Sequence, residues 1–278
     1  MNAGGELVHV VESGPADGPP LLLSAGLGEA WFDWGPTADL LSGAHRVIAY
    51  DHPGLGLSPA AQVPPSLRRD VRILADLAQR AGPPVTVLAH SMAGFPAEAL
   101  ARLHPELVNG LVLVDPSYER DPRSYPRLSA ALHPIFIGVG AVLERTRLAR
   151  LAGPAARRLI LKHTSDRGET VPAKDIREVY GRGTVLGTVL SANCAYREMA
   201  ADLVALRERR PFPDLPLIVL TALGDVGDAD RARDWAEGHR RLAAMSPRGR
   251  QIELTGTKHM IQLDRPDAVA DAVAEVLS

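Results

Sequence analysis

Residues 85–94 read Val-Thr-Val-Leu-Ala-His-Ser-Met-Ala-Gly, an apolar run that ends abruptly at a serine between small residues. The apolar, β-branched run at 85–88 predicts a buried strand, and a helical pattern follows directly. Ser91 occupies the turn between them, with the small residues Ala89 and Ala93 two positions to either side. So tight a turn would expose the serine at the carboxyl end of the strand, close to the N–H groups of the helix. An ordinary helix N-cap would also place a serine here.

The pattern around this stretch alternates between strands and helices, which predicts an α/β fold with a mostly parallel, doubly wound sheet. Several of the strand-like runs are almost continuously Val, Ile and Leu, as expected for strands covered on both faces. We predict strands at 7–11, 21–24, 46–50, 85–89, 111–114, 217–221 and 251–254, and helices at 66–80, 92–103, 229–245 and 267–277.

The alternation stops from 119 to 210, where Ala-, Leu- and Arg-rich helical stretches are broken by Pro and Gly. We therefore expect a core of residues 1–118 and 211–278, with a helical cap at 119–210 inserted between two core strands. The cap carries a net charge of +7 and the core −9. Such a basic lid would steer anionic substrates, although solvated helix faces and cap–core ion pairs account for the same pattern.

Bulk composition excludes several classes of protein. The chain has 278 residues, 46% of them hydrophobic, and a net charge of −2, so a sizeable core is expected and nucleic-acid binding is not. One cysteine, Cys194, excludes an intrachain disulfide framework. We see no signal peptide, no run long enough to span a membrane and no phosphate-, dinucleotide- or metal-binding motif, so a cytoplasmic protein without metal or cofactor is expected.

Four segments in order resemble the α/β-hydrolase superfamily over nearly the whole chain. Residues 89–94, Ala-His-Ser-Met-Ala-Gly, resemble its nucleophile elbow, and 21–28, Leu-Leu-Leu-Ser-Ala-Gly-Leu-Gly, resemble its oxyanion loop. Residues 50–58 resemble its D-x-R-G-x-G-x-S turn, and 111–115 the strand before the cap. The chain departs from the family by alanine at both elbow glycines, by Ala25 for the usual histidine and by Pro53 for the usual arginine.

The resemblance implies a catalytic triad in the order serine, acid, histidine. Ser91 would be the nucleophile and His259, after the last predicted strand, its base. Asp225 follows the strand at 217–221 in a loop similar to the family's G-x-x-D, so we expect it to be the acid. Asp115 is the alternative, because some relatives carry the acid after the earlier strand.

The backbone N–H groups of Leu27 and Met92 would form the oxyanion hole. The aromatic residues after the oxyanion loop and apolar residues of the cap are candidates for the substrate pocket, although ordinary packing would also account for them. These pocket candidates are Trp31, Phe32, Trp34 and Phe136.

The expected function is hydrolysis of small to medium, apolar carboxylic esters through an acyl-enzyme, with a small molecule as the partner. Serine at position 91 argues against the superfamily's dehalogenases and epoxide hydrolases, which use aspartate there. The same triad would also support thioester or C–C bond hydrolysis, acyl transfer or perhydrolysis. A non-catalytic ligand-binding protein is the third alternative. The sequence predicts no oligomeric state.

Overall fold

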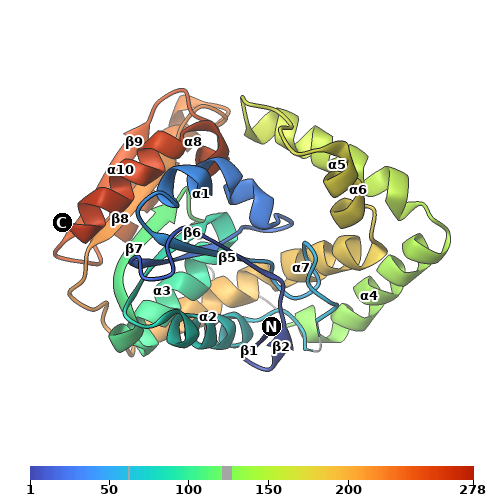
Figure 1. Ribbon diagram of the computed structural model, residues 1–278, viewed down its shortest axis with the longest axis horizontal. Coiled ribbons are helices and arrows are strands. Elements are labelled where there is room, and N and C mark those ends of the chain that lie inside the picture. The colour runs from blue at the N-terminus through green and yellow to red at the C-terminus, as the bar shows by residue number, and fades with distance from the viewer. Residues whose placement is uncertain (62, 121–126) are drawn as a thin grey trace.

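A seven-stranded sheet forms the centre of the computed structural model, which describes residues 1–61, 63–120 and 127–278 (Figure 1). The strand order is β3-β5-β4-β6-β7-β8-β9, and only the edge strand β3 runs antiparallel to its neighbour. The prediction of a mostly parallel sheet is therefore confirmed. The strands are β3 (Val10–Ser13), β4 (Pro20–Ser24), β5 (Arg46–Tyr50), β6 (Val85–His90), β7 (Val108–Val114), β8 (Leu217–Ala222) and β9 (Gly249–Leu254), and a separate pair is formed by β1 (Asn2–Ala3) and β2 (Glu6–Leu7).

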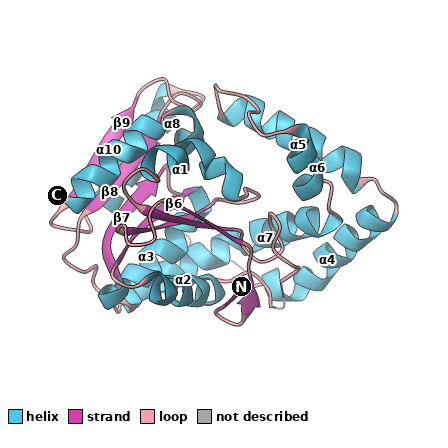
Figure 2. Ribbon diagram, in the orientation of Figure 1, coloured by secondary structure: helices cyan, strands magenta, loops and turns pink. Residues whose placement is uncertain are grey.

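Helices cover both faces of the sheet (Figure 2). Because successive strand residues point to opposite faces, Val87 joins one buried cluster and Leu88 the other. The first cluster includes residues of α2, α3 and α8, and the second includes residues of α1 and α10. The core helices are α1 (Gly35–Leu41), α2 (Leu67–Ala81), α3 (Gly94–Leu103), α8 (Ala229–Ala243), α9 (Ile261–Asp264) and α10 (Pro266–Leu277), with the 3-10 turns η1 (Trp31–Trp34), η2 (Ser91–Ala93) and η3 (Pro105–Leu107).

Among the described residues, four helices lie between β7 and β8 in the chain, and we call them the cap helices. Figure 1 shows α4, α5 and α6 to one side of the sheet. Glycines allow α4 and α7 to pack closely, since a Cβ on Gly140 would lie 2.4 Å from the carbonyl oxygen of Gly183. The cap helices are α4 (Ser129–Arg145), α5 (Ala149–Thr164), α6 (Ala173–Tyr180) and α7 (Gly183–Arg207).

Helix α7 also belongs to the core. Its later residues Ala195, Met199 and Leu203 are buried in the same cluster as α2 and α3. The helix therefore connects the outer cap helices to the sheet. Within the described ranges, no helix combines the length and the apolar character needed to cross a bilayer.

Candidate active site

Ser91 begins η2 directly after β6, at the carboxyl end of a central strand. Its φ angle is +52°, a left-handed conformation that non-glycine residues rarely adopt and that is costly unless the surroundings hold it. Ala89 and Ala93 are both buried beside the turn. The structure thus places the serine on the sharp strand-to-helix turn that the sequence indicates.

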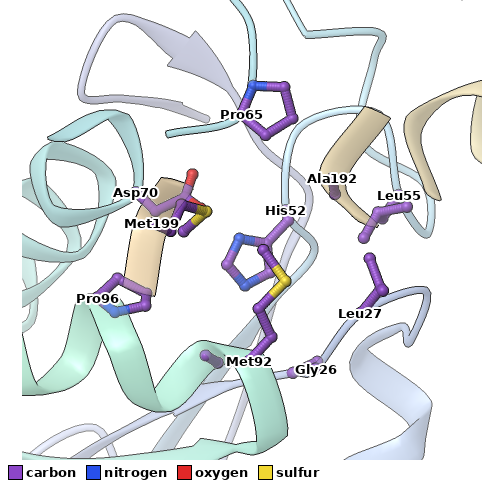
Figure 3. Close-up of a pocket in the computed structure, with 12 residues that line it drawn as sticks. Gly26, Leu27, His52, Leu55, Pro65, Asp70, Met92, Pro96, Ala192 and Met199 are labelled. Carbon is purple, nitrogen blue, oxygen red and sulfur yellow. The ribbon is translucent and has the colours of Figure 1, made fainter. Parts of the chain in front are cut away.

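The loop after β4 contacts this turn. A Cβ on Gly26 would lie 3.0 Å from Cβ of Ser91, so glycine permits the close approach. Leu27 and Met92, the next residues on the two segments, both line a small cavity of about 30 Å³ (Figure 3). Met92 is the second residue of η2, where an N–H group has no partner inside the helix.

His259 follows β9 and meets Asp115, not Asp225, through its ring. Nδ1 of His259 lies 2.5 Å from Oδ2 of Asp115. The expectation that Asp225 accepts this hydrogen bond is wrong for this structure: Asp225 is exposed and accepts from the backbone N–H of His259 at 3.1 Å. Asp115 lies within reach of the His259 ring because it directly follows β7, which pairs with β6, the strand that ends just before Ser91.

Two further donors hold the Asp115 carboxylate. Its Oδ1 accepts from the backbone N–H of Ala222 at 2.9 Å and from Nε1 of Trp235 at 3.0 Å. Sequence reasoning missed both, because neither residue is near Asp115 along the chain. With every carboxylate oxygen hydrogen-bonded, Asp115 has a fixed orientation toward the His259 ring.

The electrostatics of this pair favour an ionised acid beside a basic imidazole. Burial by itself raises the pKa of Asp115, but the hydrogen bond and charge of His259, with His239 and Trp235, bring that pKa below its ordinary value. For His259, burial lowers the pKa, yet the hydrogen bond to Asp115 and the nearby carboxylates raise it above its ordinary value.

Ser91 and His259 line the same cavity, which has a volume of about 340 Å³. The wall opposite them comes from the cap helices α5, α6 and α7 and is largely apolar. Its apolar side chains, with one from the loop before α9, are Ala156, Ile160, Leu161, Val185, Leu186, Val189 and Met260.

The four aromatic residues expected in the pocket lie elsewhere. Trp34 is fully buried against the sheet, and Trp31 packs edge-on against His9. Phe32 stacks beside Tyr180, and the half-buried Phe136 lies on the α4 segment that packs on α7. These four residues pack in the core or against neighbouring helices. The expectation that they line the substrate pocket is therefore wrong.

A buried ionic cluster joins cap and core, and two of its residues, Arg157 and Tyr180, line the cavity. The Arg157 guanidinium on α5 donates to both oxygens of Asp33 (2.7 and 3.2 Å), to Glu169 (2.8 Å) and to the Tyr180 hydroxyl (2.8 Å). It also lies over the Tyr180 ring, 4.9 Å from the centroid. All three nitrogens of the guanidinium are thereby occupied by protein groups. No local sequence pattern predicted this cluster.

Within the described part of the chain, no group of three or more His, Cys, Asp and Glu side chains is arranged to hold a metal ion. The alpha/beta hydrolase family model matches residues 21–272. The chain belongs to the α/β hydrolase family. That match begins in β4 and ends after His259, so it covers the loop after β4, the turn at Ser91, and both Asp115 and His259.

Curated relatives of this α/β hydrolase align over a shorter stretch. One from Variovorax paradoxus, named "Putative carbamate hydrolase RutD", is 40% identical over 113 residues, which is 39% of this chain and 42% of the relative. The aligned part is thus less than half the length of that relative.

Solved structures share the fold over the whole α/β hydrolase. The enol-lactonase from Burkholderia xenovorans LB400 superposes with a TM-score of 0.70 at 23% identity, over 100% of this chain and 98% of that one. A thermophilic esterase from Thermogutta terrifontis gives 0.67 at 21% identity, over 97% and 92%. At these identities the likeness concerns the fold.

Proposed function

We propose that this α/β hydrolase is a serine hydrolase that cleaves carboxylic esters of small to medium, neutral and largely apolar substrates. The observation that carries the proposal is the arrangement around His259. Its Nδ1 lies 2.5 Å from Asp115, and its side chain lines the same cavity as Ser91. A serine hydroxyl is a weak nucleophile near neutral pH unless an oriented base accepts its proton.

The mechanism follows from these positions. Ser91 attacks the ester carbonyl while Nε2 of His259 takes its proton, and Asp115 holds the imidazole in the tautomer with the proton on Nδ1. The backbone N–H groups of Leu27 and Met92 stabilise the oxyanion. His259 then protonates the leaving alcohol, and a water molecule, activated by the same base, releases the acid from Ser91.

The cavity lining supports a neutral substrate. Its wall from the cap helices is apolar apart from Thr164, Tyr180 and Arg157. The nitrogens of Arg157 donate to Asp33, Glu169 and Tyr180. No guanidinium edge is left to recognise a carboxylate. We therefore expect the net positive charge of the cap to contribute little to substrate binding.

Labelling with an active-site phosphonate tests the proposal, followed by hydrolysis of a graded series of chromogenic esters. We expect one label per chain in the wild type, none in Ser91→Ala, and the highest kcat/KM for short to medium acyl chains. A folded wild-type protein that binds the esters without labelling or turnover would indicate the ligand-binding alternative.

Carbamate hydrolysis is the second candidate, because the name of the Variovorax paradoxus relative points to it. The same serine, base and oxyanion groups would attack a carbamate carbonyl. Parallel assays of matched aryl esters and aryl carbamates distinguish the two, with the larger kcat/KM identifying the substrate class.

A further inference from the structure

The carboxylate of Glu29 connects segments that are distant in the chain. Its Oε1 lies 2.6 Å from Nδ1 of His90, the residue directly before Ser91. Its Oε2 accepts from the backbone N–H of Gly26 at 2.9 Å and from Nε2 of Gln262 on α9 at 3.3 Å. One buried side chain therefore joins the oxyanion loop, the nucleophile turn and the helix after the base.

The His90 ring extends this connection to the base itself. Its Nε2 lies 2.9 Å from the carbonyl oxygen of His259, and the two rings are 4.5 Å apart. A carbonyl oxygen only accepts, so Nε2 of His90 carries a proton. The 2.6 Å contact on the other nitrogen holds a second proton between His90 and Glu29. Although burial raises the pKa of Glu29, the charge and hydrogen bond of His90 bring that pKa below its ordinary value.

We propose that Glu29 and His90 form a brace that positions the oxyanion loop, Ser91 and His259 relative to one another. The proposal rests on the proposed function, because it assigns these segments their catalytic roles. His90 is fully buried and Glu29 nearly so, and neither has a step in the mechanism above. Both are therefore positioning residues. A displacement of about 1 Å in such a site typically costs on the order of 100-fold in rate.

Two substitutions of Glu29 separate position from charge. Glu29→Gln keeps an oxygen for Gly26 and places its amide beside Nδ1 of His90, so we expect kcat within about threefold of wild type. Glu29→Ala removes every contact, and we expect kcat to fall about 100-fold with KM nearly unchanged. Equal losses in the Gln and Ala variants, or no loss in the Ala variant, would overturn the brace.

Glu98 on α3 supplies the matched control. It is more deeply buried than Glu29 and is ion-paired with Arg102 and Arg207. Neither of these partners belongs to the oxyanion loop, the Ser91 turn or the segment around His259. Glu98→Ala should lower the midpoint of thermal unfolding at least as much as Glu29→Ala while leaving kcat nearly unchanged. A comparable fall in kcat for Glu98→Ala would make the effect of Glu29 a general loss of stability and overturn the proposal.

The brace and the proposed function fail in different ways. A wild type without ester hydrolysis contradicts the function alone, and the brace is then judged by the downfield proton resonance of the short His259–Asp115 contact. That resonance should shift or broaden in Glu29→Ala and persist in Glu98→Ala. An unchanged resonance in Glu29→Ala overturns the brace.

A different observation concerns the outer surface of the cap. On α4, Ile135, Val139 and Val142 recur at helical spacing and are 59%, 42% and 61% exposed. They lie on the side opposite the α7 contact, which uses residues 136, 137 and 140. Leu151 and Leu159 on α5, with Leu148 directly before that helix, are exposed and likewise lie opposite the buried side of α5. We call these six residues, on or next to two successive helices that contact one another, the cap stripe. Exposed apolar side chains gathered on a surface mark interaction sites.

The charge of the same segment indicates what the cap stripe meets. Residues 128–163 contain six Lys and Arg but a single acidic residue, Glu144. Arg157 is buried in its cluster, and five cations are exposed: Arg145, Arg147, Arg150, Arg158 and Lys162. None of the five forms a salt bridge with a residue that the structure describes.

We infer that the cap stripe docks on an anionic lipid surface. Such a surface accepts apolar side chains at the depth of the headgroups and attracts the surrounding cations. A second copy of this face would bring like charges together, which disfavours self-association.

Co-sedimentation with vesicles tests this inference. We expect the protein to bind phosphatidylglycerol-containing vesicles, to bind pure phosphatidylcholine vesicles far less, and to be released by salt. Leu151→Asp and Arg147→Ser should each weaken binding about fivefold or more, whereas Leu40→Asp, at a 56% exposed position on α1, should not. Absence of binding to anionic vesicles, equal loss in Leu40→Asp, or a dimer in sedimentation velocity that Leu151→Asp dissociates would overturn the inference.

Discussion

The imidazole Nδ1 of His259 lies 2.5 Å from Oδ2 of Asp115, although 144 residues separate the two along the chain. Asp225, only 34 residues before His259, accepts a hydrogen bond from the backbone N–H of the same histidine. The two aspartates therefore hold different parts of one residue, the ring and the main chain.

Substitution of each aspartate separates these roles. Asp115→Asn should lower kcat by about 10,000-fold, because an amide in place of the carboxylate favours the wrong tautomer of the histidine. Asp225→Asn keeps an oxygen acceptor for the backbone N–H and should cost less than about tenfold. Steady-state ester hydrolysis measures both, and a severe loss only in Asp225→Asn would contradict the assignment.

The pH dependence follows from the raised pKa of His259. The base must be neutral to accept the proton of Ser91, and its pKa lies above the ordinary value of 6.5. The acidic limb of kcat/KM should therefore have its midpoint above pH 6.5, with activity rising as the pH increases through it. Asp115 stays ionised across this range, because its pKa is lowered.

Asp115→Asn provides the control for the pH profile. It removes the hydrogen bond and charge that raise the pKa of His259, so the midpoint of its residual activity should move to lower pH. An unchanged midpoint would show that another group governs the acidic limb.

The size of the acyl pocket should depend on α7. Leu186 lines the active-site cavity, and Leu186→Trp would fill part of its 340 Å³. We expect kcat/KM for long-chain esters to fall at least tenfold while that for acetyl esters changes little. Phe136→Leu, on the cap but outside this cavity, is the control and should leave the chain-length preference unchanged.

The Arg157 cluster should stabilise the contact between cap and core. Arg157→Met leaves the Asp33 carboxylate buried without its cation, and breaking a buried pair in this way costs about 3–5 kcal/mol. Chemical denaturation measures the loss. The double variant Arg157→Met, Asp33→Asn should recover part of it, because no unpaired charge remains at position 33; an equally unstable double variant would contradict this account.

Local sequence patterns predicted most of the sheet and the sharp turn that carries Ser91. The exception is the edge strand, expected at 7–11 but found as β3 at Val10–Ser13. Nearly continuous apolar runs such as 85–88 form strands buried on both faces, and the small residues around Ser91 fit a sharp turn, so both signals are local. The predicted strand at 46–50 coincides with β5, because its signal is also a local apolar run.

Which aspartate meets His259 depends on the three-dimensional fold, because Asp115 and Asp225 both follow parallel strands and carry similar local signals. The two aspartates differ in position. Asp115 follows β7, which lies beside β6, and is buried, whereas Asp225 follows β8 and is exposed. The cap wall of the cavity, the Arg157 cluster and the Glu29–His90 contacts were also decided in three dimensions. Each joins residues from separate elements, and no periodicity along the chain encodes such a contact.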